Sequence, residues 1–275
     1  MGTLYLVATP IGNLEDMSLR AVRILREAVL IAAEDTRHTG KLLKHFEIET
    51  KLTSYFEHNK LGKLDRILDA LGEGDVALVS DAGTPAINDP GYELVRAALA
   101  AGHRVSPVPG PSSPVAALSA SGLPTDSFLY LGYLPRKPSD RQALIRQVEN
   151  LPYTLIFLET PHRLLVALED LESGLGDRPV AIARELTKLH EQVWRGTLAG
   201  AREYFADHEP RGEFTLVIGG RATMDDRPRW SEDKVMIAIK FGLKLGESPS
   251  ALAKRIAHES GWARREIYDL IQEMG

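Results

Sequence analysis

Three loops of the sequence gather the turn-forming, hydroxyl and carboxyl side chains that a small-molecule site requires: ATPIGNLED (8–16), SDAGTPAINDPG (80–91) and VPGPSSPVAA (108–117). In the second loop, Gly83 lets the backbone approach a ligand closely, and Pro85 fixes the chain beyond it. In the third, two adjacent serines lead into a helix, whose first N–H groups favour a carboxylate or another anion. The three loops together predict a binding site for a polar small molecule.

Two further segments bring ionisable groups together. The segment 33–46 places Glu34, Arg37 and a histidine after an apolar run, and the segment 54–60 adds His58. Such clusters can transfer a proton or hold a polar substrate, and a solvated, salt-bridged surface is the alternative. The histidines lack the H-E-x-x-H spacing and no triplet has metal-ligand spacing, so no metal site is predicted.

Each loop also has a purely structural interpretation. An ordinary strand-to-helix turn accounts for the first loop equally well, single aspartates of the second can be caps, and either serine of the third can be an N-cap. We favour a site for the second loop as a whole, because its density of Gly, Pro and Asp exceeds what a connection needs. The sequence contains neither G-x-G-x-x-G nor G-x-x-x-x-G-K-[ST], so neither a Rossmann dinucleotide site nor a P-loop is supported.

The elements that must position these loops alternate between strand-length apolar runs and amphipathic helices. Such alternation predicts a mainly parallel α/β sheet covered on both faces, with ligands at the carboxyl ends of the strands. A second cycle of strands and helices follows the Pro- and Gly-rich stretch 107–114, which is the predicted domain boundary. Predicted strands lie at 4–8, 29–34, 75–80, 104–108, 128–134, 154–159, 180–185 and 213–220, and predicted helices at 18–28, 59–71, 92–101, 115–121 and 140–150. We therefore expect two α/β domains, at 1–111 and 112–224.

The remaining segment, 225–275, does not continue the alternation of strands and helices. A polar linker precedes three helix-like pieces at 232–245, 250–258 and 264–273, with Gly261 at the turn between the last two. This pattern is typical of a helix-turn-helix, and a small helical cap on the second domain is the alternative. In an RNA-contacting tail, the candidate side chains are Lys254, Arg255, Arg264 and Arg265.

Composition limits the classes of partner and chemistry. The 275 residues include 33 Lys and Arg against 38 Asp and Glu, a net charge of −5, so an RNA substrate requires basic groups gathered on one face or in a cleft. The lack of cysteine excludes disulfides, thiolate zinc sites and a cysteine nucleophile. No segment has the pattern of a secretory signal or the roughly 18 apolar residues of a membrane span, so we expect a cytoplasmic protein.

At these loops the sequence resembles the ribosomal RNA small subunit methyltransferase I branch of the tetrapyrrole (corrin/porphyrin) methylase superfamily. The resemblance covers about residues 3–220 and the helical tail. The segments that show the resemblance are, in chain order, LVATPIGNLEDMSLRA, AAEDTRHTGKLL, SYFEHN, SDAGTPAINDPGYELV, PVPGPSS, LPTDSFLYLGYLPRK, FLETPHRL, ARELTKLHEQVWRG and GEF. The chain departs from the wider superfamily where ATPIG replaces a G-x-G-x-G-D loop and G-T-P replaces G-D-P. Both departures favour RNA over a porphyrin as substrate.

The resemblance implies S-adenosylmethionine in a cleft between two α/β domains and a homodimer. It also implies methylation of a cytidine 2′-hydroxyl in the decoding region of 16S ribosomal RNA. The cofactor-binding residues expected on this basis are Pro10, Gly83, Thr84, Pro85, Ile87, Ser112, Ser113, Leu158, Thr160, Ala183, Glu213 and Phe214.

A ribose hydroxyl is a poor nucleophile while protonated, so we expect a nearby base as well as accurate positioning. His58 and Glu34 are the first candidates for this base, and Glu185 and Lys188 are the next. Arg37 and Lys60 suit phosphate contacts. Two other functions stay open at this point: a methyltransferase acting on a tetrapyrrole or another small molecule, and a non-catalytic RNA-binding protein of ribosome assembly.

Overall fold

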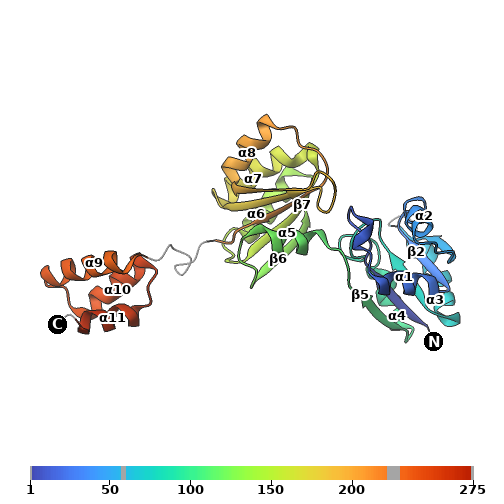
Figure 1. Cartoon of the computed structure of the whole chain (residues 1–275), viewed down its shortest axis with the longest axis horizontal. Helices are drawn as coiled ribbons and strands as arrows, with labels where there is room; N and C mark the ends of the chain where they lie inside the picture. Colours follow the sequence, from blue (N-terminus) through green and yellow to red (C-terminus); the bar gives the residue numbers. More distant parts are fainter. Residues whose placement is uncertain (1, 57–59, 222–229, 274–275) are drawn as a thin grey trace.

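A fully parallel sheet of five strands forms the first part of the computed structural model, which describes residues 2–56, 60–221 and 230–273 (Figure 1). Its spatial order is β3-β2-β4-β1-β5, and every neighbouring pair runs parallel. The prediction of a parallel sheet is confirmed, and β3 is a short edge strand that the apolar pattern did not indicate. The strands are β1 (Thr3–Val7), β2 (Leu30–Ala33), β3 (Leu52–Ser54), β4 (Val76–Val79) and β5 (Arg104–Val108).

Helices cover both faces of this sheet. Helix α1 (Leu19–Glu27) follows a short 3-10 turn, η1 (Leu14–Asp16), and begins after Ser18, whose hydroxyl caps the helix. The helix buries apolar residues at i, i+3 and i+4 spacing against the sheet, and α2 (Thr36–His45) contributes to the same core. Helices α3 (Lys60–Glu73) and α4 (Tyr92–Ala100) pack on the other face.

The second sheet is mixed. Its order is β6-β7-β10-β8-β9, in which β6 and β7 are parallel and the other neighbouring pairs are antiparallel. Strand β9 was not predicted, because it is a half-exposed edge strand with few apolar residues. The strands are β6 (Phe128–Tyr133), β7 (Thr154–Glu159), β8 (Pro179–Arg184), β9 (Gln192–Thr197) and β10 (Phe214–Ile218).

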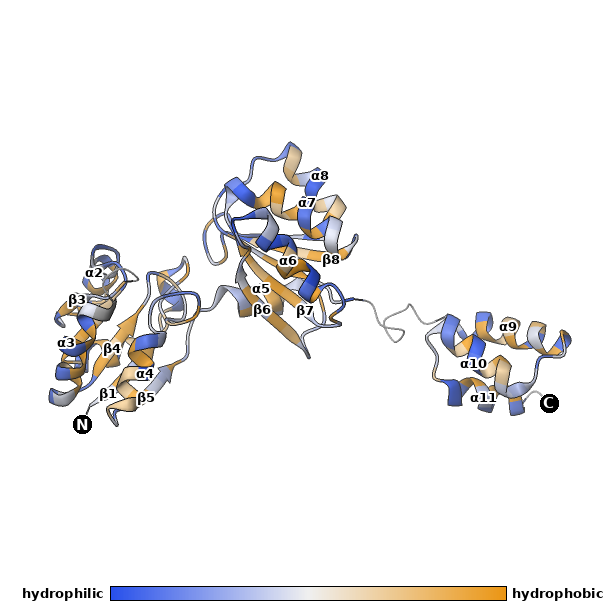
Figure 2. Cartoon of the chain, turned by 180° about the vertical axis from the view of Figure 1, so that it is seen from behind, coloured by the Kyte–Doolittle hydropathy of each residue, from blue (hydrophilic) through white to orange (hydrophobic). Residues whose placement is uncertain are grey.

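One face of the second sheet packs on α5 (Ser113–Ser121), the helix that follows the third predicted loop. The opposite face carries three helices and the larger core, in which Phe157, Phe205 and Phe214 are buried. These helices are α6 (Pro138–Val148), α7 (Leu164–Leu175), which follows the 3-10 turn η2 (Pro161–Arg163), and α8 (Leu198–Asp207). Figure 2 shows apolar residues concentrated on the strands of both sheets. The predicted α/β class is therefore confirmed.

The C-terminal tail contains the three predicted helices, α9 (Glu232–Lys244), α10 (Pro249–Ser260) and α11 (Arg264–Glu273). Its buried cluster includes Val235, Leu252 and Ile267 and no described residue of the two α/β parts. Gly261 ends α10 in the left-handed conformation, with φ 68°, at the predicted turn. No described helix of the chain is long and apolar enough to cross a membrane.

Candidate functional site

The loops after β1, β4 and β5 meet at the carboxyl edge of the first sheet. The Thr9 N–H donates to the Gly83 carbonyl at 2.9 Å, and the Gly83 N–H donates back to the Thr9 carbonyl at 3.0 Å. The Thr84 hydroxyl then donates to the Pro111 carbonyl at 3.3 Å. Gly83 has φ 81°, which glycine adopts without strain. The three predicted loops therefore form one continuous wall, which we call the N-terminal wall.

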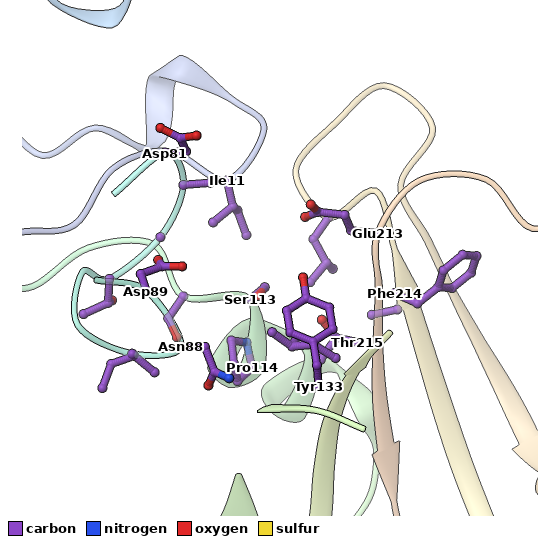
Figure 3. Close-up of a pocket in the computed structure, with 18 of the residues that line it drawn as sticks. Ile11, Asp81, Asn88, Asp89, Ser113, Pro114, Tyr133, Glu213, Phe214 and Thr215 are labelled. Carbon is purple, nitrogen blue, oxygen red and sulfur yellow. The ribbon is translucent and has the colours of Figure 1, made fainter. Parts of the chain in front are cut away.

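The second sheet supplies the facing wall, here called the C-terminal wall. Strand pairing places Tyr133 beside Leu158, Leu158 beside Thr215, and Thr215 beside Ala183. The four side chains consequently form one row across β6, β7, β10 and β8. All four line one cavity of about 240 Å³ between the two walls (Figure 3).

A β-bulge in β6 determines which side chains reach this cavity. The register shifts between Tyr130 and Gly132, so that Tyr130 pairs with Ile156 and Tyr133 pairs with Leu158. Alternation in a regular strand would place two residues three apart on opposite faces, whereas the extra residue returns both tyrosines to the same face. Tyr130 and Tyr133 accordingly both line the cavity.

The two walls touch at two glycines. A Cβ added to Gly12 would lie 2.9 Å from the Leu186 carbonyl oxygen, and one added to Gly132 would lie 2.2 Å from the Asn88 side-chain nitrogen. Gly132 also has φ 65°. Small residues at these positions let the walls approach closely.

Backbone strain is concentrated in the same loops. Among the described non-glycine residues, five have positive φ, and four of them are Ala86, Asn88, Glu185 and Thr187 in the two walls. Such conformations cost about 1–3 kcal/mol each and persist only where surrounding contacts enforce them. They are typical of loops that are shaped for binding rather than for stability.

The cavity brings together most of the residues that the sequence singled out. Nine expected cofactor residues and three expected catalytic residues line it: Gly83, Thr84, Ile87, Ser112, Ser113, Leu158, Ala183, Glu213, Phe214, Glu34, Glu185 and Lys188. Three expected cofactor residues, Pro10, Pro85 and Thr160, are not among the lining residues. The predicted base His58 lies outside the described residues, as does the side chain of Lys60.

Several lining residues were missed by the sequence analysis. Tyr130 and Tyr133 carried no signal, because the bulge that orients them has no reliable pattern in a single sequence. Thr215 belongs to an uninterrupted buried strand. Asp81 and Asp89 belong to the second loop, which the sequence predicts as a site as a whole, although the sequence favours a cap for either aspartate taken alone. Asp81 does act locally, since its carboxylate accepts from the Asp35 N–H at 3.0 Å.

The lining is strongly acidic. Among the described residues that line the cavity, five are carboxylates and one is an amine: Glu34, Asp81, Asp89, Glu185, Glu213 and Lys188. Asp81 and Asp89 lie on one side of the cavity and Glu213 on the other (Figure 3). Among the described residues, no group of three potential ligands is placed to hold a metal ion. The cavity is therefore suited to an organic cation and opposes phosphate-rich ligands.

Burial and mutual repulsion perturb these carboxyl groups. Burial raises the pKa of Glu34 above its ordinary value, and the nearby Asp89 carboxylate adds to the rise. Burial also raises the pKa of Asp89, although a hydrogen bond from Ser80 opposes this. Burial raises the pKa of Tyr130 to about 12 and raises that of Tyr133 as well. Both phenols therefore remain hydrogen-bond donors at neutral pH.

These shifts predict a pH dependence of stability. A carboxyl group whose pKa is raised in the folded state contributes most to the free energy of unfolding at pH values below its unfolded-state pKa. This contribution is lost as the pH rises through the folded-state pKa. For Glu34 and Asp89 the loss of stability begins near their ordinary pKa values, 4.5 and 3.8, and continues as the pH rises. We expect Glu34→Gln/Asp89→Asn to flatten this dependence and to be more stable than the unmodified protein at pH 7. Urea unfolding between pH 5 and 7 measures both effects, and a variant less stable at pH 7 would contradict the expectation.

The candidate catalytic groups lie on both sides of the cavity. The Glu34 side chain accepts from the Asp81 N–H at 3.4 Å, which links the ends of β2 and β4. On the opposite wall, Lys188 Nζ lies 3.0 Å from Glu185 Oε1, within the strained loop after β8. This arrangement places a carboxyl group of raised pKa across the cavity from an ion pair.

The predicted RNA-contacting residues lie elsewhere. Arg37 is exposed and pairs with Asp35 at 2.8 Å, whereas Arg255 of the tail pairs with Glu247 at 2.8 Å. Arg264 donates to the Ser250 hydroxyl at 2.9 Å. Lys254 and Arg265 are exposed. None of these five side chains is among the described residues that line the cavity.

Comparison with known proteins places this geometry in a family. Residues 3–201 match the family described as Tetrapyrrole (Corrin/Porphyrin) Methylases. The chain belongs to the tetrapyrrole methylase family. Relatives named ribosomal RNA small subunit methyltransferase I include a Synechocystis protein that is 50% identical and covers 100% of this chain and 99% of its own. A Halalkalibacterium halodurans protein of the same name is 47% identical, over 99% of this chain and 95% of its own.

Solved structures of tetrapyrrole methylases share this architecture. A uroporphyrin-III-C-methyltransferase from Thermus thermophilus superposes with a TM-score of 0.56 at 25% identity, covering 79% of this chain and 94% of its own. The cobalt precorrin-4 methyltransferase CbiF superposes with a TM-score of 0.58 at 16% identity and also covers 79% of this chain and 94% of its own. At this identity the likeness shows the fold alone. The expected fold, two α/β parts with an additional helical tail, is confirmed.

Proposed function

We propose that this protein transfers a methyl group from S-adenosylmethionine to the 2′-hydroxyl of a cytidine in the decoding region of 16S ribosomal RNA. The observation that carries the proposal is the acidic cavity between the two walls. The full-length relatives named as small-subunit ribosomal RNA methyltransferases support its substrate class. The proposed domains, 1–111 and 112–224, would meet within the third loop of the N-terminal wall, and we expect a cytoplasmic homodimer.

The lining residues fit S-adenosylmethionine in charge and shape. Its sulfonium and ammonium groups are cations, which suit the carboxylates of Asp89 and Glu213 on opposite walls. Leu158 and Ala183 offer an apolar surface for a flat purine. When bound, S-adenosylmethionine supplies a methyl group that its sulfonium makes strongly electrophilic.

The start of helix α5 is suited to the cofactor's carboxylate. Ser112 is the N-cap residue, but its hydroxyl makes no capping bond to the described N–H groups of the helix. Ser112 and Ser113 both line the cavity, so their hydroxyls and the free N–H groups of the first turn can bind an anion there. This anion site complements the acidic remainder of the lining.

Glu34 is our preferred base among the described residues. Burial and Asp89 raise its pKa, which makes it a stronger proton acceptor for a ribose hydroxyl than an ordinary carboxylate. Lys188, held by Glu185, is suited to orienting the hydroxyl or an adjacent phosphate. Tyr133 can donate a hydrogen bond from the opposite wall, because its raised pKa keeps the phenol protonated. His58 stays a hypothesis.

The acidic lining favours RNA over a tetrapyrrole as the methyl acceptor. A carboxylate-bearing macrocycle such as a uroporphyrin would bring its own negative charges against those of Asp81, Asp89 and Glu213. RNA can present one ribose to the cavity and keep its phosphates outside. This difference is the physical reason for preferring RNA to a porphyrin-type substrate.

The β6 bulge gives a test of the cofactor site. Gly132→Ala should lower the free energy of unfolding by about 1–2 kcal/mol, because alanine is strained at φ 65°. It should also weaken S-adenosylmethionine binding several-fold, because the new Cβ meets Asn88 at the cavity. Gly122→Ala is the matched control, since Gly122 has φ 78° and nothing within 4 Å of an added Cβ. Calorimetric titration should show a loss of affinity in the first variant alone, and equal affinities would contradict the assignment.

The activity itself is tested with tritiated S-adenosylmethionine and small ribosomal subunits from a strain that lacks the modification. We expect label on a cytidine ribose of 16S RNA. Cofactor binding without label on RNA would favour a small-molecule methyltransferase. Absence of cofactor binding in calorimetry would favour a non-catalytic assembly protein.

A further inference from the structure

A second cavity, of about 340 Å³, lies in the C-terminal part of the α/β region. Its lining comes from the segment after β6, from the start of α6, and from the segment that contains η2 and the start of α7. The lining residues are Arg136, Pro138, Arg141, His162, Arg163, Val166 and Ala167. We call this cavity the basic groove, because three arginines and a histidine surround it.

Two of the arginines build the groove. Arg141 is 5% exposed, pairs with Asp170 at 2.5 Å, and donates to the carbonyls of Pro135 and Arg136 at 3.2 and 3.1 Å. Arg163 donates to the Leu134 carbonyl at 2.5 Å. These bonds hold the segment after β6 in one conformation, so the groove is a preformed feature.

The other two basic residues are available to a ligand. Arg136 and His162 are exposed, and within the described parts of the chain no hydrogen bond or ion pair engages either side chain. Val166 is 50% exposed and, with Pro138, gives the groove an apolar component. A cationic rim beside an apolar surface suits a nucleotide, because the rim binds phosphate and the apolar surface receives the ribose or base.

The groove lies close to the first cavity along two strands. Arg136 follows Tyr133 by three residues, and His162 follows Leu158 by four. An extended chain spans at most about 3.6 Å per residue, so these separations are at most about 11 and 14 Å. Tyr133 and Leu158 both line the first cavity. The groove lies on the face of the second sheet that carries α6 and α7, and the first cavity on the face that packs on α5, so a single RNA strand would pass around the carboxyl ends of β6 and β7 to reach both.

We propose that the basic groove binds a phosphodiester of the RNA strand next to the nucleotide that enters the acidic cavity. This inference rests on the proposed function and adds a docking site to it. It also resolves a difficulty of charge, because a protein of net charge −5 needs local basic groups to hold RNA. The acidic cavity would receive the ribose, and Arg136 and His162 would hold the backbone outside it.

The test compares Arg136→Ala/His162→Ala with Arg146→Ala. Arg146 is an exposed arginine eight residues beyond the start of α6, about 12 Å along the helix, and is absent from the groove lining. The probe is the unmodified small ribosomal subunit, with binding measured by filter retention at several salt concentrations. We expect the double variant to bind about tenfold more weakly, with a salt slope reduced by about one to two. Its affinity for S-adenosylmethionine should be unchanged, and Arg146→Ala should match the unmodified protein.

Binding and methylation are measured separately, so that the two proposals can fail independently. If the unmodified protein methylates the subunit and the double variant binds it with unchanged affinity and salt slope, the groove proposal is wrong and the proposed function stands. If the subunit binds through the groove but receives no label, the proposed function is wrong and the groove is supported. An equal loss of affinity in Arg146→Ala would also overturn the groove, because it would indicate a general charge effect.

Discussion

Asp89→Asn/Glu213→Gln should weaken S-adenosylmethionine binding by about 30-fold and S-adenosylhomocysteine binding by only about fivefold. A carboxylate near a unit positive charge contributes at least about 1 kcal/mol even with strong solvent screening. Two such losses amount to about 2 kcal/mol, or about 30-fold in affinity. S-adenosylhomocysteine keeps the ammonium but lacks the sulfonium charge, so it should lose only the attraction at the ammonium, about 1 kcal/mol. Calorimetric titration of both ligands at pH 7.5 measures the difference.

The control for this prediction is Asp126→Asn. Asp126 is exposed before β6 and does not line the cavity, so its replacement changes the net charge without changing the site. Equal weakening of both ligands would indicate that the two carboxylates act by shaping the walls. No weakening of either ligand would remove the argument that the cavity binds a cation.

Phe214→Ala should lower the free energy of unfolding by about 3–5 kcal/mol. Phe214 is 1% exposed, starts the central strand β10, and packs edge to face on Phe205 with ring centroids 5.6 Å apart. Its removal leaves a void in the core beneath the cavity. Phe214→Leu should cost less than about 1.5 kcal/mol, because leucine fills most of the space.

Urea unfolding measures this loss when it is followed by tryptophan fluorescence in a Trp230→Phe/Trp262→Phe background, which leaves Trp194 in the same core as the only tryptophan. Phe128→Ala is the matched control, since Phe128 is 46% exposed on β6. Phe128→Ala should change the free energy of unfolding by less than about 0.5 kcal/mol. Similar losses for Phe214→Ala and Phe128→Ala would mean that β10 does not organise the second core.

The central strands β2 and β4 of the first sheet were predictable because all their residues are buried. Such strands appear in a sequence as uninterrupted apolar runs. Parallel strands also send their carboxyl ends to one edge, which brought Gly83 and Ser112 together as the loop positions indicated.

The rest depended on features that a single sequence does not encode locally. Strand β9 is a half-exposed edge strand, so its apolar pattern is weak. The row of Tyr133, Leu158, Thr215 and Ala183 depends on the register between separate strands, which is parallel for β6 and β7 and antiparallel for the other two pairs. The basic groove depends on buried guanidinium bonds from Arg141 to a loop, and a sequence pattern shows only that the arginine is present.

The β6 bulge also bears on how this site can change over evolutionary time. One additional residue near Leu131 restores Tyr130 to the cavity side without any substitution in the rest of the sheet. A one-residue deletion near Leu131 would turn Tyr130 away from the cavity and place the side chain of a neighbouring residue there instead. Homologues whose corresponding strand is one residue shorter should therefore differ in the cavity even where an alignment with a one-residue gap shows identical tyrosines. Substrate preference within such a group would follow strand length as much as residue identity.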